Sequence, residues 1–165
     1  MTQQHQKRLS QLAGLAILGQ VVLLTSAWLL PLVSDYGLVG DNISELALGR
    51  YGLVQTTAFF LAGMGTLCLA LAISQATVRS RRTFIGSLLV GIYGLGAVLL
   101  AFFPTDRIDS RADVWSQSAT GTMHIIVTLI SFSCVLVGMF VLTSSFARDA
   151  RWRPVHPWSM LFPAG

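Results

Sequence analysis

Charged residues are scarce in this chain of 165 residues. They make up 11% of it, whereas an average soluble domain has about 25%. Hydrophobic residues make up 53%. A soluble domain of this size could not bury so much apolar surface, because its ratio of surface to volume is too high. The composition therefore excludes an ordinary water-soluble domain and indicates that the chain lies in a lipid bilayer.

Charge is absent altogether from four long apolar runs, at residues 12–33, 53–73, 84–103 and 120–146. Each has about 20 residues or more, enough for a helix to cross a hydrocarbon core of about 30 Å. A charge at the centre of such a helix would cost roughly 2.5–3.5 kcal/mol. The sequence therefore predicts an all-α fold, a polytopic transmembrane helical bundle of about four spans that forms one integral membrane domain over residues 1–165.

Motifs of common enzyme and cofactor sites are also missing. The sequence has no Walker A motif, no GxGxxG after a strand, no HExxH and no GxSxG. Its two cysteines, Cys68 and Cys134, lie inside apolar runs and have no zinc-binding spacing. We therefore expect no cofactor and no bound metal, and the residues do not favour an enzyme.

Positive charge is distributed unevenly about the predicted spans. One side carries Lys7, Arg8, Arg79, Arg81, Arg82, Arg148, Arg151 and Arg153, and the other carries Arg50, Arg107 and Arg111. The positive-inside rule places the richer side in the cytoplasm. We therefore expect a multi-pass protein of a prokaryotic plasma membrane, with its N-terminus and C-terminal tail cytoplasmic. Its arginine clusters suit the lipid surface rather than nucleic acid.

Small and polar residues are spaced along single faces of the predicted spans. Such faces allow transmembrane helices to approach closely, within the chain or in a homo- or hetero-oligomer. The three stripes are Ala58, Ala62, Gly65 and Ala72; Ser87, Gly91, Gly94 and Ala101; and Gly121, His124, Thr128 and Ser131. Gln20, in the middle of the first span, should also face inward, because lipid offers its amide no partner.

Two segments outside the spans carry signals of their own. Asn42 and Glu45 have the spacing of a capping box, and Gly49 suits the end of a helix, so a short helix is expected between them. The final ten residues, 156–165, resemble the start of a fifth span but are too few to cross the membrane. We interpret them as a truncated span or an interfacial tail.

Five polar residues form a candidate cluster at the outer end of the spans: Asn42, Ser44, Glu45, Asp106 and His124. Two carboxylates and a histidine could bind a divalent metal, perform acid–base chemistry, or line a proton or cation path. The alternative is structural, because charged residues at helix ends commonly cap turns and form interhelical hydrogen bonds. The structural interpretation is the favoured one.

The motifs around these residues resemble those of a known family. Residues 42–46 (Asn-Ile-Ser-Glu-Leu), 49–51, 103–106 and 121–124 are similar to a bacterial and archaeal family of uncharacterised membrane proteins, the domain of unknown function 998. The Asn-Ile-Ser-Glu element also resembles, more weakly, membrane proteins of the Frag1/DRAM type. The resemblance implies a polytopic membrane fold, usually with about six spans, and no established activity.

These observations favour a non-enzymatic membrane module that binds a lipid, an ion or a partner protein. Two alternatives stay open: a component of a transporter or channel, and a membrane-embedded hydrolase that uses Glu45, Asp106 and His124. The polar stripe of the fourth span ends after Ser131, which counts against a conducting path through this chain alone.

Overall fold

Four long α-helices dominate the structure, a computed structural model that describes residues 2–34, 36–37, 41–107 and 116–157. The helices are α1 (Gln3–Leu29), α2 (Gly52–Ala76), α3 (Arg81–Leu100) and α4 (Ala119–Phe146). Each is long and apolar enough to cross a membrane. No strand occurs within the ranges described. The predicted all-α architecture with four membrane spans is confirmed.

The helix boundaries depend on caps that follow from the sequence. Ser118 precedes α4 and its side chain accepts a hydrogen bond from the Gly121 N–H. Ser80 caps α3 in the same way by accepting from the Thr83 N–H. The first helix starts well before the predicted residue 12, since Thr2 caps it through the His5 N–H. The hydroxyl acceptors at these three N-caps each satisfy a backbone donor that has no partner within the helix.

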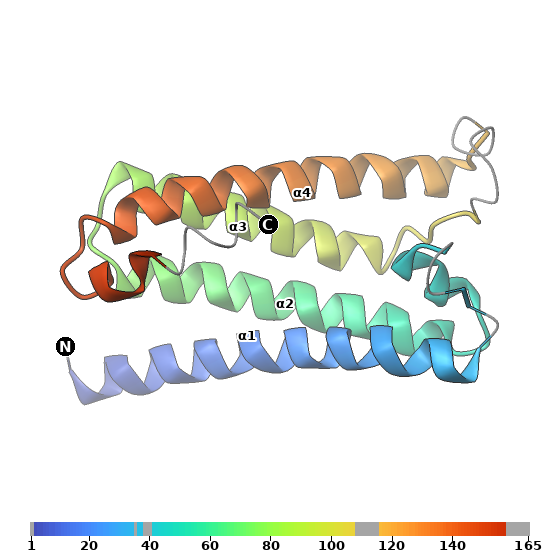
Figure 1. Cartoon of the computed structure of the whole chain (residues 1–165), viewed down its shortest axis with the longest axis horizontal. Helices are drawn as coiled ribbons and strands as arrows, with labels where there is room; N and C mark the ends of the chain where they lie inside the picture. Colours follow the sequence, from blue (N-terminus) through green and yellow to red (C-terminus); the bar gives the residue numbers. More distant parts are fainter. Residues whose placement is uncertain (1, 35, 38–40, 108–115, 158–165) are drawn as a thin grey trace.

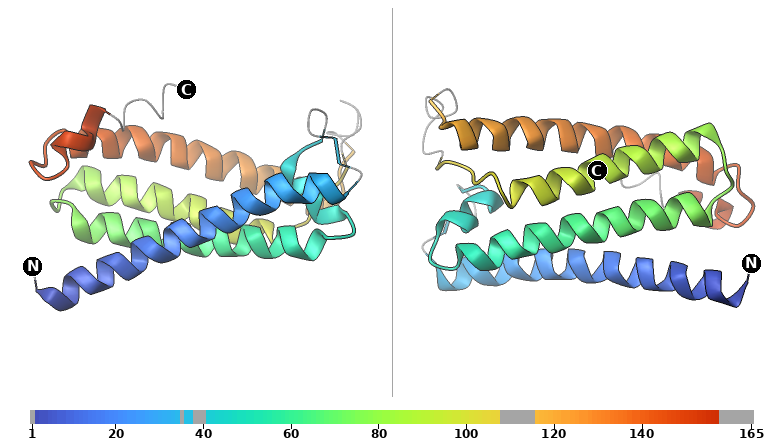
Figure 2. Two further views of the ribbon diagram at one scale, coloured as in Figure 1. Left: turned by 60° about the horizontal axis from the view of Figure 1, so that its bottom comes forward. Right: turned by 180° about the vertical axis from the view of Figure 1, so that it is seen from behind.

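The helices form an open row in chain order (Figure 1). Close packing joins α1 to α2, α2 to α3, and α3 to α4. The right-hand view of Figure 2 shows the same order, and the left-hand view shows α1 running obliquely to the other helices. One end of the row holds the described parts of the two longer connections, 34–51 and 101–118; we call it the long-loop end. The other, which we call the termini end, holds the start of α1, the α2–α3 connection and residues 147–157.

Glycine and alanine allow these helices to touch at the backbone. A Cβ added to Gly63 would lie 2.7 Å from the Gly94 carbonyl oxygen and 2.7 Å from the Val98 backbone nitrogen, so the backbones of α2 and α3 meet closely there. A Cβ added to Gly19 would lie 2.5 Å from the Leu61 carbonyl oxygen, which makes the same kind of contact between α1 and α2. The predicted stripe on the second span is buried, at Ala58, Ala62, Gly65 and Ala72.

The stripe predicted on the third span needs a correction. Ser87 and Gly94 are buried as expected. Gly91 is not a close-packing position, because a Cβ there would meet only the Ala70 Cβ, at an ordinary 3.8 Å. Gly86 and Gly96 are instead the buried glycines toward α4, facing Leu142 and Ser131. The α3 helix uses two faces, one for each neighbour, and a single predicted stripe captured only the face toward α2.

Polar contacts inside the row follow the expectation for Gln20. Its Nε2 donates to the Ala62 carbonyl oxygen at 3.2 Å and to the Thr66 hydroxyl at 3.0 Å. The amide therefore points inward and links α1 to α2. On α4 the predicted stripe also turns inward, and Gly121, His124 and Ser131 are buried.

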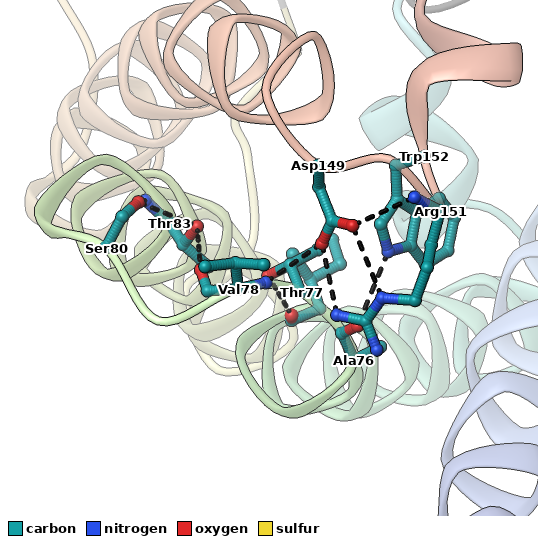
Figure 3. A network of polar contacts seen from close by, with 9 residues as sticks. Ala76, Thr77, Val78, Ser80, Thr83, Asp149, Arg151 and Trp152 are labelled. Carbon is teal, nitrogen blue, oxygen red and sulfur yellow. Dashed lines mark hydrogen bonds and ion pairs between the residues drawn. The ribbon is translucent and has the colours of Figure 1, made fainter.

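A buried carboxylate ties the chain after α4 to the α2–α3 connection (Figure 3). Asp149 is 4% exposed and accepts from the Val78 N–H at 3.0 Å. Arg151 donates to it from its backbone, at 3.0 Å, and from its guanidinium, at 3.1 Å. These hydrogen bonds, the side-chain one above all, lower the pKa of Asp149 against the opposing effect of burial. Trp152 adds a contact to the Ala76 carbonyl at 3.4 Å and stacks on Phe146.

Two predictions fall on segments outside the described residues. The start of a fifth span was expected over 156–165, of which the structure describes only residues 156 and 157. Arg111, one of the cations counted on the long-loop side, lies outside the described ranges.

Candidate functional site

The short helix predicted between the first two spans is present as η2, a 3₁₀-helix over Ile43–Leu48. Glu45 closes its first turn: Oε1 accepts from the Asn42 backbone N–H at 3.4 Å and from the Asn42 side-chain amide at 2.9 Å. Gly49 follows the helix as its C-cap. At Gly52 only glycine fits, because an added Cβ would overlap the Ala47 carbonyl. The η2 helix therefore folds back tightly on the start of α2.

This folding encloses a cavity of about 590 Å³ at the long-loop end. Four of its lining residues carry charge: Asp41, Glu45, Arg50 and Arg107. They come from the loop before η2, from η2 itself, from the turn before α2 and from the segment after α3. Apolar side chains at the end of the first span and on η2 complete the wall, namely Leu30, Leu32, Val33, Leu46 and Leu48. The cavity thus combines both signs of charge with an apolar side.

The carboxylates lie near the tyrosine at the cavity wall. The Tyr36 hydroxyl donates to the Asp41 carbonyl oxygen at 2.7 Å, and the Asp41 carboxylate accepts from the Gly37 N–H at 2.8 Å. The pKa of Tyr36 is raised, first by burial and then by the negative charges of Asp41 and Glu45. Both carboxylates therefore act on one region of the cavity, where a cation would be stabilised.

The two guanidinium groups supply the opposite charge. Arg50 is exposed and lies over the Tyr51 ring, with its Cζ 5.6 Å from the ring centroid. Such cation–π contacts orient an arginine without neutralising it. Arg107 reaches the cavity from the chain after α3. Arginine is suited to phosphate and carboxylate groups, because its planar fork donates two parallel hydrogen bonds.

Asp106 and His124 lie in a second group of contacts, at the start of α4. The Asp106 carboxylate accepts from the Ser118 N–H and, at 2.9 Å, from the Ser118 hydroxyl. A Cβ at Gly121 would collide with that carboxylate, so Gly121 makes room for Asp106. Its negative charge next to a helix N-terminus is stabilising. The Nδ1 of His124 lies 2.7 Å from the Phe103 carbonyl oxygen and must donate, since a carbonyl only accepts.

The described contacts do not join the five predicted site residues into one cluster. Asn42 binds Glu45, Asp106 binds Ser118, and His124 binds the carbonyl of Phe103. Of the five, Glu45 alone lines the cavity, while Ser44 is half-buried on η2. In the part of the chain that the structure describes, no three His, Cys, Asp or Glu residues are placed to hold a metal ion. A joint site of all five stays a prediction, and these contacts support structural roles for Asp106 and His124.

Sequence reasoning did not assign four of the polar residues of the cavity to a site: Tyr36, Asp41, Arg50 and Arg107. Two of them are direct neighbours of predicted residues, since Asp41 precedes Asn42 and Arg107 follows Asp106. The available signal was the presence of charges of both signs beside the ends of three spans. Spacing alone did not show which of two adjacent side chains enters the cavity.

Comparison with known proteins identifies one relation. The family model described as "Protein of unknown function (DUF998)" matches residues 9–164. No curated protein and no solved structure matches the chain.

Proposed function

Because the chain belongs to the DUF998 family, whose description states no activity, we propose a function from the site alone: the protein is a non-enzymatic membrane module that binds the head group of a zwitterionic lipid. The cavity at the long-loop end is the binding site. The observation that carries the proposal is its lining, which brings two carboxylates and two guanidinium groups to the end of the apolar helices.

The charges suit a head group with an ammonium and a phosphate, as in phosphatidylethanolamine. The region of Asp41 and Glu45 accepts the ammonium, and the guanidinium groups of Arg50 and Arg107 donate to the phosphate. An anionic head group without an amine would leave the carboxylates facing negative charge. A small polar solute with the same two groups fits the charges equally well, and the apolar side of the cavity argues for the lipid.

The apolar side continues onto a surface suited to acyl chains. Leu32 and Val33 are 74% and 60% exposed, and they lie at the end of the first span. A lipid whose head group occupies the cavity would extend its chains along these residues into the hydrocarbon region. Exposed apolar surface of this kind is expected where a helix faces lipid.

The orientation of the protein determines which leaflet supplies the lipid. We propose, from the excess of Lys and Arg at the termini end, that this end is cytoplasmic and that the protein lies in a cell membrane. The long-loop cavity then opens to the outer leaflet of that membrane.

The test compares phosphatidylethanolamine with phosphatidylglycerol of the same acyl chains, added to the detergent-purified protein and counted by native mass spectrometry. The binding that is lost in Arg50→Gln, which reports on the cavity, should be greater for phosphatidylethanolamine than for phosphatidylglycerol. Arg50→Gln should weaken phosphatidylethanolamine binding about fivefold, because one cation near a membrane surface contributes about 1 kcal/mol. Glu45→Gln should weaken it too, while its amide oxygen can still accept the two Asn42 donors that hold the η2 turn.

The matched control is Arg148→Gln, an exposed arginine at the termini end, which should leave binding unchanged. Soluble glycerophosphoethanolamine separates the two sources of the head group. If it binds as tightly as the lipid, the ligand is the polar solute and the acyl chains contribute nothing. Phosphatidylethanolamine binding that is equal in the wild type, Arg50→Gln and Glu45→Gln would refute a head-group site in the cavity.

A further inference from the structure

We propose a second lipid site at the opposite end of the protein, for an anionic phospholipid of the leaflet at the termini end. The site is a groove of about 1220 Å³ between α2 and α3, distinct from the long-loop cavity and independent of the function proposed for it. Its mouth is formed by His5, Arg79 and Arg81, and its floor by apolar and small side chains of both helices.

The depth of the groove matches one leaflet. Along α2 and its C-cap the lining extends from Leu67 to Thr77, which corresponds to a rise of about 15 Å at 1.5 Å per residue. Half of a hydrocarbon core of about 30 Å has the same depth. The polar and basic residues lie at one end of this path and leucines at the other, as the head group and chain of a phospholipid require.

The charge at the mouth selects an anion. None of the described residues that line the groove is acidic, whereas Arg79 and Arg81 are both exposed there. The same mouth contains the start of α3, where Ser80 and Thr83 line the groove. A helix N-terminus adds partial positive charge to that of the arginines. Basic residues beside a membrane surface attract anionic head groups.

A buried hydroxyl gives independent evidence that something polar occupies the groove. Ser87 lines it, is 6% exposed, and its Oγ has no hydrogen-bond partner among the described residues. An unsatisfied polar group in an apolar setting is costly. The glycerol and ester oxygens of a phospholipid lie deeper in the bilayer than its phosphate. They would supply the acceptor that the Ser87 hydroxyl lacks.

Gly91 explains why the groove stays open. It lines the groove, and a Cβ there would meet only the Ala70 Cβ at 3.8 Å. A glycine that is not needed for helix contact therefore leaves room where an acyl chain would lie. A leucine at this position should fill the groove, and its Cβ would keep an ordinary van der Waals distance from Ala70 of α2.

The experiment measures binding of dioleoyl phosphatidylglycerol and dioleoyl phosphatidylcholine to the detergent-purified full chain by native mass spectrometry. The wild type should prefer phosphatidylglycerol. The double variant Arg79→Gln/Arg81→Gln should weaken phosphatidylglycerol binding by at least about tenfold and leave phosphatidylcholine binding nearly unchanged. Arg82→Gln is the matched control, because Arg82 is exposed in the same region but does not line the groove.

Gly91→Leu tests the chain rather than the head group, and it should reduce binding of both lipids while the thermal unfolding temperature stays near that of the wild type. If Arg82→Gln weakens binding as much as the double variant, the attraction is general surface charge and the groove is not the site. Unchanged binding in Gly91→Leu would also overturn the proposal. Arg50→Gln should keep full phosphatidylglycerol binding, so failure at one site is distinguishable from failure at the other.

Discussion

Two glycine-to-alanine substitutions, one at the contact between α2 and α3 and one on an open face of α1, should have opposite effects on stability. At Gly63 the new Cβ would lie 2.7 Å from the Gly94 carbonyl oxygen and 2.7 Å from the Val98 backbone nitrogen. Backbone atoms cannot rotate away, so the two helices must separate. Overpacking of this kind costs about 1–3 kcal/mol. At Gly14, on α1, an added Cβ has no neighbour within 4 Å, and alanine should gain up to about 1 kcal/mol of helix propensity.

The assay is unfolding of both variants in detergent under identical conditions, monitored by circular dichroism. Gly63→Ala should unfold at lower temperature or denaturant than the wild type, and Gly14→Ala at equal or higher values. Gly91→Ala, whose Cβ makes only an ordinary contact, should behave like Gly14→Ala. If Gly63→Ala is as stable as Gly14→Ala, the backbones do not meet at this glycine and the packing argument fails.

Three further perturbations test other parts of the molecule. Gln20→Leu should destabilise the α1–α2 pair by about 0.6–1.7 kcal/mol, the range for hydrogen bonds between membrane helices, whereas the exposed Gln11→Leu should not, as detergent unfolding would show. Asp149→Asn should lower stability at neutral pH. Because the folded protein lowers the pKa of Asp149, the stabilisation by its carboxylate is present above about pH 4 and is lost as the pH falls through the folded pKa. The stabilities of the wild type and Asp149→Asn, measured by unfolding, should therefore converge in acid. In a background without native cysteines, a membrane-impermeant thiol reagent added to intact cells should label Ser44→Cys and not Arg82→Cys; the reverse pattern would invert the proposed orientation.

The parts of the fold that were predictable are those governed by local chemistry. An uncharged run of about 20 residues has few alternatives to a transmembrane helix, so the four spans could be read directly. The short η2 helix was predictable from Asn42 and Glu45, because a capping box is a contact between residues three apart. Gln20 could be predicted to face inward because lipid offers an amide no partner, and its hydrogen bonds to α2 confirm this orientation.

The parts that could not be predicted depend on contacts between distant segments. The sequence gives no measure of how the loop before η2 and the chain after α3 approach each other, so the cavity and its arginines were not foreseen. No motif in the sequence indicated a role for Asp149, which joins the end of α4 to Val78 across the row. The prediction that Gly91 packs closely against a neighbouring helix was wrong for the same reason, because a periodic stripe does not specify which neighbour each residue of α3 faces.

The most direct test of the lipid-binding function is to locate the head group on the chain. A phosphatidylethanolamine with a photoactivatable group on its head group is incorporated with the protein into nanodiscs, irradiated, and its adducts are mapped by peptide mass spectrometry. We expect adducts on the segment from Tyr36 to Tyr51 and at Arg107, competed by unlabelled phosphatidylethanolamine and reduced in Arg50→Gln. Adducts spread evenly along the apolar helices, or unaffected by competitor and variant, would contradict the proposal that the long-loop cavity binds a lipid head group.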